Sequence, residues 1–208
     1  MTRVQRIALL VALAFLVGSI GYAIGSRSGD GVAGGGSPSP DSADVGFLWD
    51  MIAHHEQALV MSQYQISGGA EPRVSKFARE IVQSQSYEIG LMEAYLQRWG
   101  QPRYRPDDGR AMAWMGHHAM ATDEMPGMAT ETQLERLADA TGRDVDALFL
   151  ELMKRHHDGG VEMAEAGADR AEDRDVRELA ARIARYQRVE VKELEMTRVW
   201  LGLPRVDL

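Results

Sequence analysis

Residues 47–61 read FLWDMIAHHEQALVM, and residues 149–163 read FLELMKRHHDGGVEM. The two stretches belong to an internal duplication in which residues 47–103 recur as residues 149–205 without a gap, at a constant offset of 102 (149 minus 47). Repeated units adopt equivalent structures and bury their apolar faces against each other. The duplication therefore predicts one domain made of two similar halves, and a site in the first half is expected, in some form, in the second.

Each copy contains two long stretches with helical spacing of apolar residues, separated by a short break rich in Gly, Pro or acidic residues. Between the copies lies a methionine-rich crossover, residues 104–143. Strand signals are almost absent, so the pattern predicts an all-α fold, a four-helix bundle of two helical hairpins over residues 45–208. The expected helices span residues 43–67, 72–99, 144–167 and 174–201, with a short acidic helix at 131–140.

The first 25 residues differ in composition from the rest. Arg3 and Arg6 precede an apolar stretch, residues 7–25, which has about the length that a helix needs to cross a bilayer. We expect a signal anchor that holds the protein at the cell membrane by this single helix, with a cleaved signal peptide and secretion as the alternative. In both cases the bundle is extracytoplasmic. Residues 26–44, rich in Gly, Ser and Pro, are expected to be a flexible linker.

The composition narrows the classes of partner and ligand. The formal net charge is −8, which disfavours a nucleic-acid partner because phosphate is repelled by an acidic surface. The chain contains no cysteine. It therefore forms no disulfides, and a site for a soft metal has to be built from methionine and histidine.

All six histidines occur in three adjacent pairs, His54-His55, His117-His118 and His156-His157. Imidazole beside thioether is a ligand set for soft metals, so copper, as Cu(I) or Cu(II), is the cofactor that we expect. The crossover also contains Met125 and Met128, and a flexible methionine-rich loop could exchange metal quickly. The methionines nearest the three pairs are Met51, Met61, Met112, Met115, Met120, Met153 and Met163.

The repeat indicates which histidine of each pair faces inward. Adjacent residues of a helix point about 100° apart, so the two members of a pair cannot lie equally on one face. The helical face that contains His54 keeps the same residue classes in the second copy. On the face that contains His55, the second copy has Lys154 where the first has Ile52. We therefore expect His54 and His156 to face the interior, and His55 and His157 to lie toward its boundary.

The second and fourth predicted helices offer polar groups that could support these histidines. Gln85, Glu88 and Met92 share one helical face, and Gln187, Glu190 and Leu194 occupy the matching positions of the other copy. A buried carboxylate or amide opposite an imidazole orients the ring by hydrogen bonding. Candidate supporting residues are therefore Gln85, Glu88, Met92, Gln187 and Glu190, whereas Tyr87, Tyr95, Trp99, Tyr186 and Trp200 are assigned to packing in the core or at its rim.

The doubled Met-x-x-His-His pattern at residues 51–58 and 153–160 resembles the domain of unknown function 305 family, as does Met125-Pro126-Gly127-Met128 in the crossover. The resemblance covers residues 44–203 and implies a ferritin-like helical bundle, typically exported. Some members of that family are associated with copper binding and copper tolerance. For this chain the resemblance implies the metal ligands Met51, His54, His55, Met61, His117, His118, Met120, Met125, Met128, Met153, His156, His157 and Met163.

The two copies differ where a bound cation would be affected. Lys154 and Arg155 replace neutral residues beside the third pair, and positive charges oppose cation binding. Leu194 stands where the first copy has Met92. A site in the second copy is therefore expected to be weaker.

The sequence favours an exported, membrane-tethered copper-binding protein that sequesters or transfers copper. One alternative is a non-catalytic helical interaction or pH-sensing module, since doubled histidines could charge near pH 6. The other is a ferritin-like metal-dependent oxidase, but neither repeat contains the Glu-x-x-His motif of di-iron bundles, which disfavours an enzyme. The expected partner is the membrane, through residues 7–25, while a homo-oligomer or a metal-transfer partner stays open.

Overall fold

The structure, a computed structural model, describes residues 37–106, 108–116 and 118–208. This part of the chain is helical and contains no β-strand, as the sequence predicts, and each predicted helix ends within three residues of the observed end. The α-helices are α2 (Ala43–Gly68), α3 (Pro72–Arg98), α4 (Glu131–Asp139), α5 (Arg143–Arg170) and α6 (Arg174–Trp200), and the crossover adds the 3-10 turns η1 (Asp108–Arg110), η2 (Ala113–Met115) and η3 (Thr122–Glu124).

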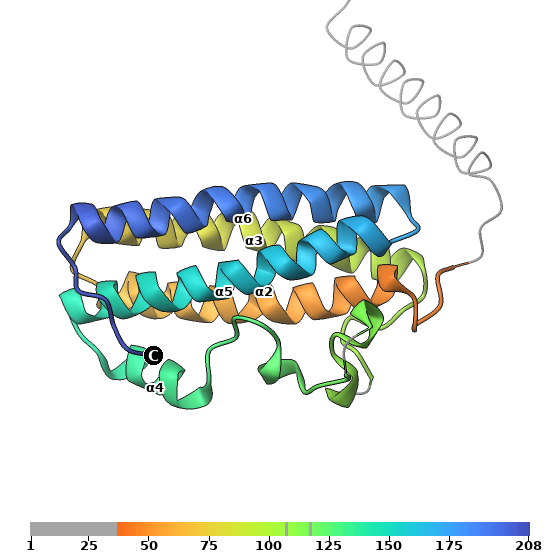
Figure 1. Ribbon diagram of the computed structural model, residues 1–208, viewed down its shortest axis with the longest axis horizontal. Coiled ribbons are helices and arrows are strands. Elements are labelled where there is room, and N and C mark those ends of the chain that lie inside the picture. Colours follow the sequence, from red (N-terminus) through yellow and green to blue (C-terminus); the bar gives the residue numbers. More distant parts are fainter. Residues whose placement is uncertain (1–36, 107, 117) are drawn as a thin grey trace, which may run out of the picture. The chain divides into compact units, whose positions relative to one another are not determined.

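The four long helices form two antiparallel hairpins, α2 with α3 and α5 with α6 (Figure 1). The hairpins join mainly through α2 and α5, which pack on each other. The crossover runs back along the bundle on the α2 and α5 side, carrying α4 with it (Figure 1). As a result, α2 and α5 are covered on their outer side, whereas α3 and α6 lie on the other side of the bundle.

Buried aspartates at equivalent positions connect the two hairpins. Asp44, in the first turn of α2, accepts hydrogen bonds from the backbone N–H groups of Glu172 and Asp173, in the turn between α5 and α6. Asp146, its copy in α5, accepts from Ala70 and Glu71 in the turn between α2 and α3. Each hairpin thus satisfies the backbone donors at the start of the other hairpin's second helix, which would otherwise lack partners.

The interior consists of two apolar clusters separated by a polar layer. One cluster contains Phe47, from the first half of α2, and residues from the second halves of α3 and α5. The other contains Phe149, from the first half of α5, and residues from the opposite halves of the same helices. Burial of each large apolar side chain stabilises the fold by roughly 1.5–3 kcal/mol. The layer between the clusters holds the buried polar residues His54, His55, Gln85, Glu88, His156, His157 and Gln187, together with the partly exposed Glu190.

The predicted packing of the aromatic residues is partly wrong. Tyr95 and Trp99 pack against the first apolar cluster, with ring centroids 5.9 Å apart. In contrast, Tyr87, Tyr186 and Trp200 are 65%, 60% and 70% exposed. The reason for the first two is helical geometry, because their neighbours Glu88 and Gln187 take the inward positions and adjacent side chains point about 100° apart.

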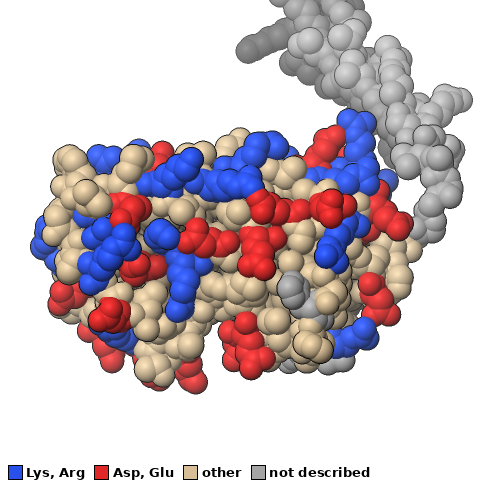
Figure 2. Space-filling view, viewed as in Figure 1, with Lys and Arg blue, Asp and Glu red and all other residues tan. Residues whose placement is uncertain are grey.

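The expected membrane helix, residues 7–25, and the linker up to residue 36 lie outside the described residues. The linker prediction extends too far, since α2 begins at Ala43. No helix within the described ranges combines the length and the apolar character that crossing a bilayer requires. On the face shown in Figure 2, Lys and Arg side chains are interspersed with Asp and Glu, so this face carries no extended basic patch.

Candidate metal site

His54 and His156 stack on each other at the centre of the polar layer. Their ring centroids are 3.7 Å apart and the ring planes are inclined by 30°. Both residues are fully buried, so the predicted inward direction of both is confirmed. Gly160 makes the approach possible, because a Cβ atom there would lie 3.1 Å from Cε1 of His54 and would overlap the amide of Gln187.

His55 and His157 are also fully buried, so their predicted position at the boundary is wrong. His55 donates from Nε2 to Oε2 of Glu88 at 2.9 Å, and His157 donates from Nε2 to Oε2 of Glu190 at 3.0 Å. The predicted boundary position assumes that each helix buries one face. In the bundle, α2 and α5 pack on each other and each also packs on its hairpin partner, so two faces of each helix are buried.

The hydrogen bonds determine which ring nitrogen of three histidines carries the proton. The carbonyl oxygen of Pro126 and the carboxylates of Glu88 and Glu190 can only accept, so Nε2 is the donor in His54, His55 and His157. A neutral ring that donates from Nε2 carries a free lone pair on Nδ1, as in the metal-binding tautomer that supporting residues impose on histidine ligands.

These lone pairs are buried and have no partner. Nδ1 of all four bundle histidines, Nε2 of His156, and both amide atoms of Gln85 and Gln187 make no hydrogen bond in the described structure. Nearly all buried polar atoms in proteins have a partner, and leaving one without costs about 1–3 kcal/mol. A layer with so many unpaired donors and acceptors has the groups to bind a ligand or ordered water.

The imidazoles of His54 and His156, the inner histidines, are held neutral by burial. Burial lowers the pKa of His54 to about 3, with a further lowering by His55 that outweighs the opposing hydrogen bond to Pro126. Burial also lowers the pKa of His156 well below its ordinary value, and the neighbouring histidines add to this effect. Neutral imidazole is the form that binds a metal ion, so neither ring has to lose a proton near neutral pH.

Thioether groups lie in the core on both sides of the layer. Met51 precedes His54 by one helical turn, Met153 precedes His156 in the same way, and both are fully buried. Met61 and Met163, which follow His54 and His156 by about two helical turns, are also fully buried, as is Met92 on α3. Because α2 and α5 are antiparallel, Met51 and Met163 lie in one apolar cluster and Met61 and Met153 in the other.

The crossover touches the histidine layer directly at Pro126-Gly127. The carbonyl oxygen of Pro126 accepts from Nε2 of His54 at 3.1 Å. Gly127 has a φ of 81°, and a Cβ atom there would come within 2.9 Å of Cα of His156. A Cβ atom on Gly159 would overlap the backbone of Pro126. The crossover therefore closes the layer on the α2 and α5 side with backbone against backbone.

The other crossover candidates are placed differently. Met112, Met115 and Met125 are buried, Met120 and Met128 are partly buried, and His118 is exposed, so His118 does not join the buried pairs. His117 lies outside the described residues. The expectation of a loose loop is not met near η2, because Asp50 accepts hydrogen bonds from the backbone N–H of Met112 and from the Trp114 indole.

The two cations beside the third pair point away from the layer. Lys154 pairs with Asp158 at 2.8 Å, and Arg155 donates to the carbonyl oxygen of Met128 and to the side chain of Gln133. Arg155 thus fastens the crossover to α5. The repulsion that the sequence predicts is reduced by these partners, while Leu194 does replace a sulfur atom of the first copy by a buried alkyl group.

The described residues contain no group of three or more His, Asp or Glu side chains arranged to hold a metal ion. What the structure brings together is four imidazoles, with thioethers above and below them. This donor set fits a soft metal better than one that needs several carboxylates. The contact of Pro126-Gly127 with the layer was missed by sequence reasoning, although Gly159-Gly160 in place of Gln57-Ala58 was a signal of close backbone approach.

Comparison with known sequences gives one family. The sequence profile of the family described as "Domain of unknown function (DUF305)" matches residues 44–198. No protein with a curated description matched the chain.

Among solved structures, a DUF305 protein from Streptomyces coelicolor that is thought to be secreted is 30% identical, with a TM-score of 0.74, and the match covers 82% of this chain and 100% of that one. A DUF305 fragment from Deinococcus radiodurans is 31% identical, with a TM-score of 0.62 and coverage of 74% and 94%. CopM in its Cu(II)-bound form is 26% identical, with a TM-score of 0.57 and coverage of 76% and 97%. CopM in its Ag-bound form is also 26% identical, with a TM-score of 0.57 and coverage of 74% and 94%.

Proposed function

The chain belongs to the domain of unknown function 305 family, and from this premise we propose that it is an exported copper-binding protein that sequesters copper or passes it on through histidine and methionine ligands. The observation that carries the proposal is the stacked pair His54 and His156. Both rings are fully buried, and three of their four ring nitrogens have no partner in the described structure. A buried pair of neutral imidazoles is costly unless a ligand binds it.

The chemistry of the surrounding donors supports copper among the metals. Imidazole accepts Cu(I) and Cu(II), and thioether favours Cu(I) and other soft ions. CopM, which shares the fold, has been solved with Cu(II) and with Ag bound. We assign His54 and His156 as the central ligands, His55 and His157 as flanking ligands positioned by Glu88 and Glu190, and the core methionines as the source of sulfur.

Export and tethering are part of the same proposal. The related Streptomyces coelicolor protein is thought to be secreted. We propose that residues 7–25 direct export and hold the bundle at the outer surface of the cell membrane. An oxidising compartment suits a metal site that contains no thiol, because thioether and imidazole ligands are not lost to disulfide formation.

The proposal is tested by equilibrating the metal-free chain with Cu(I), Cu(II) or Zn(II), removing unbound metal and measuring what remains bound. The double variant His54→Ala, His156→Ala should lose most of the bound copper. The matched control is His118→Ala, which removes an exposed histidine and should leave the core site intact. Circular dichroism verifies that each variant is folded. Equal amounts of copper on the chain and on the folded double variant would refute the assignment.

A further inference from the structure

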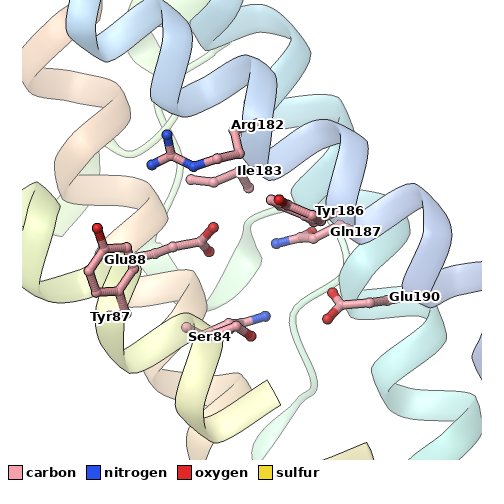
Figure 3. A pocket seen from close by; sticks show the side chains of 9 residues that line it. Ser84, Tyr87, Glu88, Arg182, Ile183, Tyr186, Gln187 and Glu190 are labelled. Carbon is pink, nitrogen blue, oxygen red and sulfur yellow. The ribbon is translucent and has the colours of Figure 1, made fainter. Parts of the chain in front are cut away.

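A pocket of about 490 Å³ opens between α3 and α6 at the level of the histidine layer. Each of these helices packs on its hairpin partner, but they do not pack closely on each other. The pocket lies between α3 and α6, and its lining includes Glu88 and Glu190, the hydrogen-bond partners of the outer histidines His55 and His157. Figure 3 shows the carboxylates of Glu88 and Glu190 and the amide of Gln187 directed toward the space between the two helices.

The inner wall of the pocket is rich in oxygen atoms that have no partner. Glu88 and Glu190 each use Oε2 to accept from a histidine, and Oε1 of each has no hydrogen bond in the described structure. Gln85 and Gln187 also line the pocket, are each 2% exposed, and have neither amide atom paired. Two carboxylates and two unpaired amides form a lining suited to a hydrated cation, because hard and borderline cations prefer oxygen ligands.

The layer is closed on its other sides. Pro126 and Gly127 cover it on the α2 and α5 side, where added Cβ atoms would overlap the backbone. Along the bundle axis, the two apolar clusters with Phe47 and Phe149 fill the core and exclude water. The pocket between α3 and α6, which is lined by residues of the layer, is therefore an open approach to it.

We propose that this pocket is the port through which a hydrated Cu²⁺ ion reaches the buried histidines and leaves them. The inference rests on the proposed function and adds the route and the form of the metal. Glu88 and Glu190 supply the first protein oxygens that replace water of hydration. Each carboxylate also accepts a hydrogen bond from a buried histidine, His55 or His157. Oxygen ligands suit Cu²⁺, whereas a soft monovalent ion gains little from them.

Arg182 gives the port a charge that can be tested. It lines the pocket, and the described structure shows no ion pair or hydrogen bond for its guanidinium group. A positive charge beside the path of a cation slows its entry through Coulomb repulsion, which salt screens. Replacing Arg182 by a neutral residue should therefore accelerate the association of Cu²⁺.

The experiment measures the association rate of Cu²⁺ with the full metal-free chain by stopped-flow quenching of tryptophan fluorescence, and the bound copper at equilibrium. Arg182→Gln should raise the rate constant about twofold at low ionic strength, and the gain should vanish at high salt. Its control, Arg185→Gln, makes the same change of net charge at an exposed position of α6 outside the pocket. Neither change should alter the copper bound at equilibrium.

A steric variant tests the route independently. Ser84→Trp places a bulky ring at the edge of the pocket and should slow association several-fold, whereas Gln83→Trp adds the same ring one residue outside it. If the chain binds copper through His54 and His156 but all four variants associate at the same rate, the port is wrong and the proposed function stands. If the unaltered chain binds no copper, the proposed function and the port are both refuted.

Discussion

Histidine is used in this bundle as a neutral, buried base. Burial keeps the pKa of His54 at about 3 and that of His156 well below its ordinary value. The cause is desolvation, which penalises the charged imidazolium, and each nearby histidine adds to the penalty. A pH sensor near neutrality needs groups that charge there. The two inner rings do not meet that requirement, which weighs against the pH-sensing alternative for this pair.

The lowered pKa values predict how stability depends on pH in the metal-free protein. Unfolded His54 binds a proton below about pH 6.5 and folded His54 only below about pH 3, so the unfolded state binds more protons between these values. The free energy of unfolding should therefore be largest above pH 6.5 and fall as the pH decreases, by about 1.4 kcal/mol per pH unit for His54 alone. Urea unfolding at pH 7, 6 and 5 measures the slope. His54→Gln should reduce it, whereas a slope that persists unchanged would contradict the assignment.

At the scale of the elements, local signals predicted the helices well. Helix ends depend on nearby residues, such as the Ser42 cap of α2 and Pro72 at the start of α3. Apolar periodicity and capping residues were therefore enough to predict where the helices begin and end. The path of the crossover was not predictable in this way. It depends on contacts between residues distant in sequence, above all the approach of Pro126 to Gly159, which local patterns do not encode.

This contact predicts a difference between two substitutions of helical glycines. Gly159→Ala would force the crossover away from α5, because its Cβ atom would overlap the Pro126 backbone, and should destabilise the fold by about 1–3 kcal/mol. Gly90→Ala, on the exposed face of α3 with nothing within 4 Å, should instead stabilise the fold by about 0.5–1 kcal/mol. The midpoints of urea unfolding compare the two. A stable Gly159→Ala variant would mean that the crossover does not depend on this close packing.

At the scale of the whole molecule, the duplication predicted two equivalent hairpins but not how their interior is divided. His54 was correctly placed inside, because the repeat keeps the residue classes of its helical face. His55 was misplaced, because its environment is created by the packing of α2 on α3 as well as on α5. A polar layer between two apolar clusters arises only when all four helices are assembled. Its residues are spread over more than 130 positions of the chain (54 to 190), so the pattern of a single helix does not predict that they come together.

The layer predicts that stability and metal binding oppose each other in this bundle. The unpaired nitrogens of His54 and His156 lower the stability of the metal-free fold. The double variant His54→Leu, His156→Leu should therefore have a free energy of unfolding about 1–3 kcal/mol higher than that of the unaltered chain without metal. The same variant should lose the stabilisation that copper gives by binding the folded state alone. Thermal unfolding with and without copper measures both effects.

The matched pair is His55→Leu with His157→Leu, which removes the outer histidines instead. This variant leaves the carboxylates of Glu88 and Glu190 without their partners, and a charge that loses its partner is destabilising. It should therefore be less stable than the unaltered chain in the absence of metal, although the change of residue type is identical. If both double variants shifted the metal-free stability in the same direction, the distinction between an inner pair that lacks partners for three of its four ring nitrogens and an outer pair that is hydrogen-bonded to Glu88 and Glu190 would be wrong.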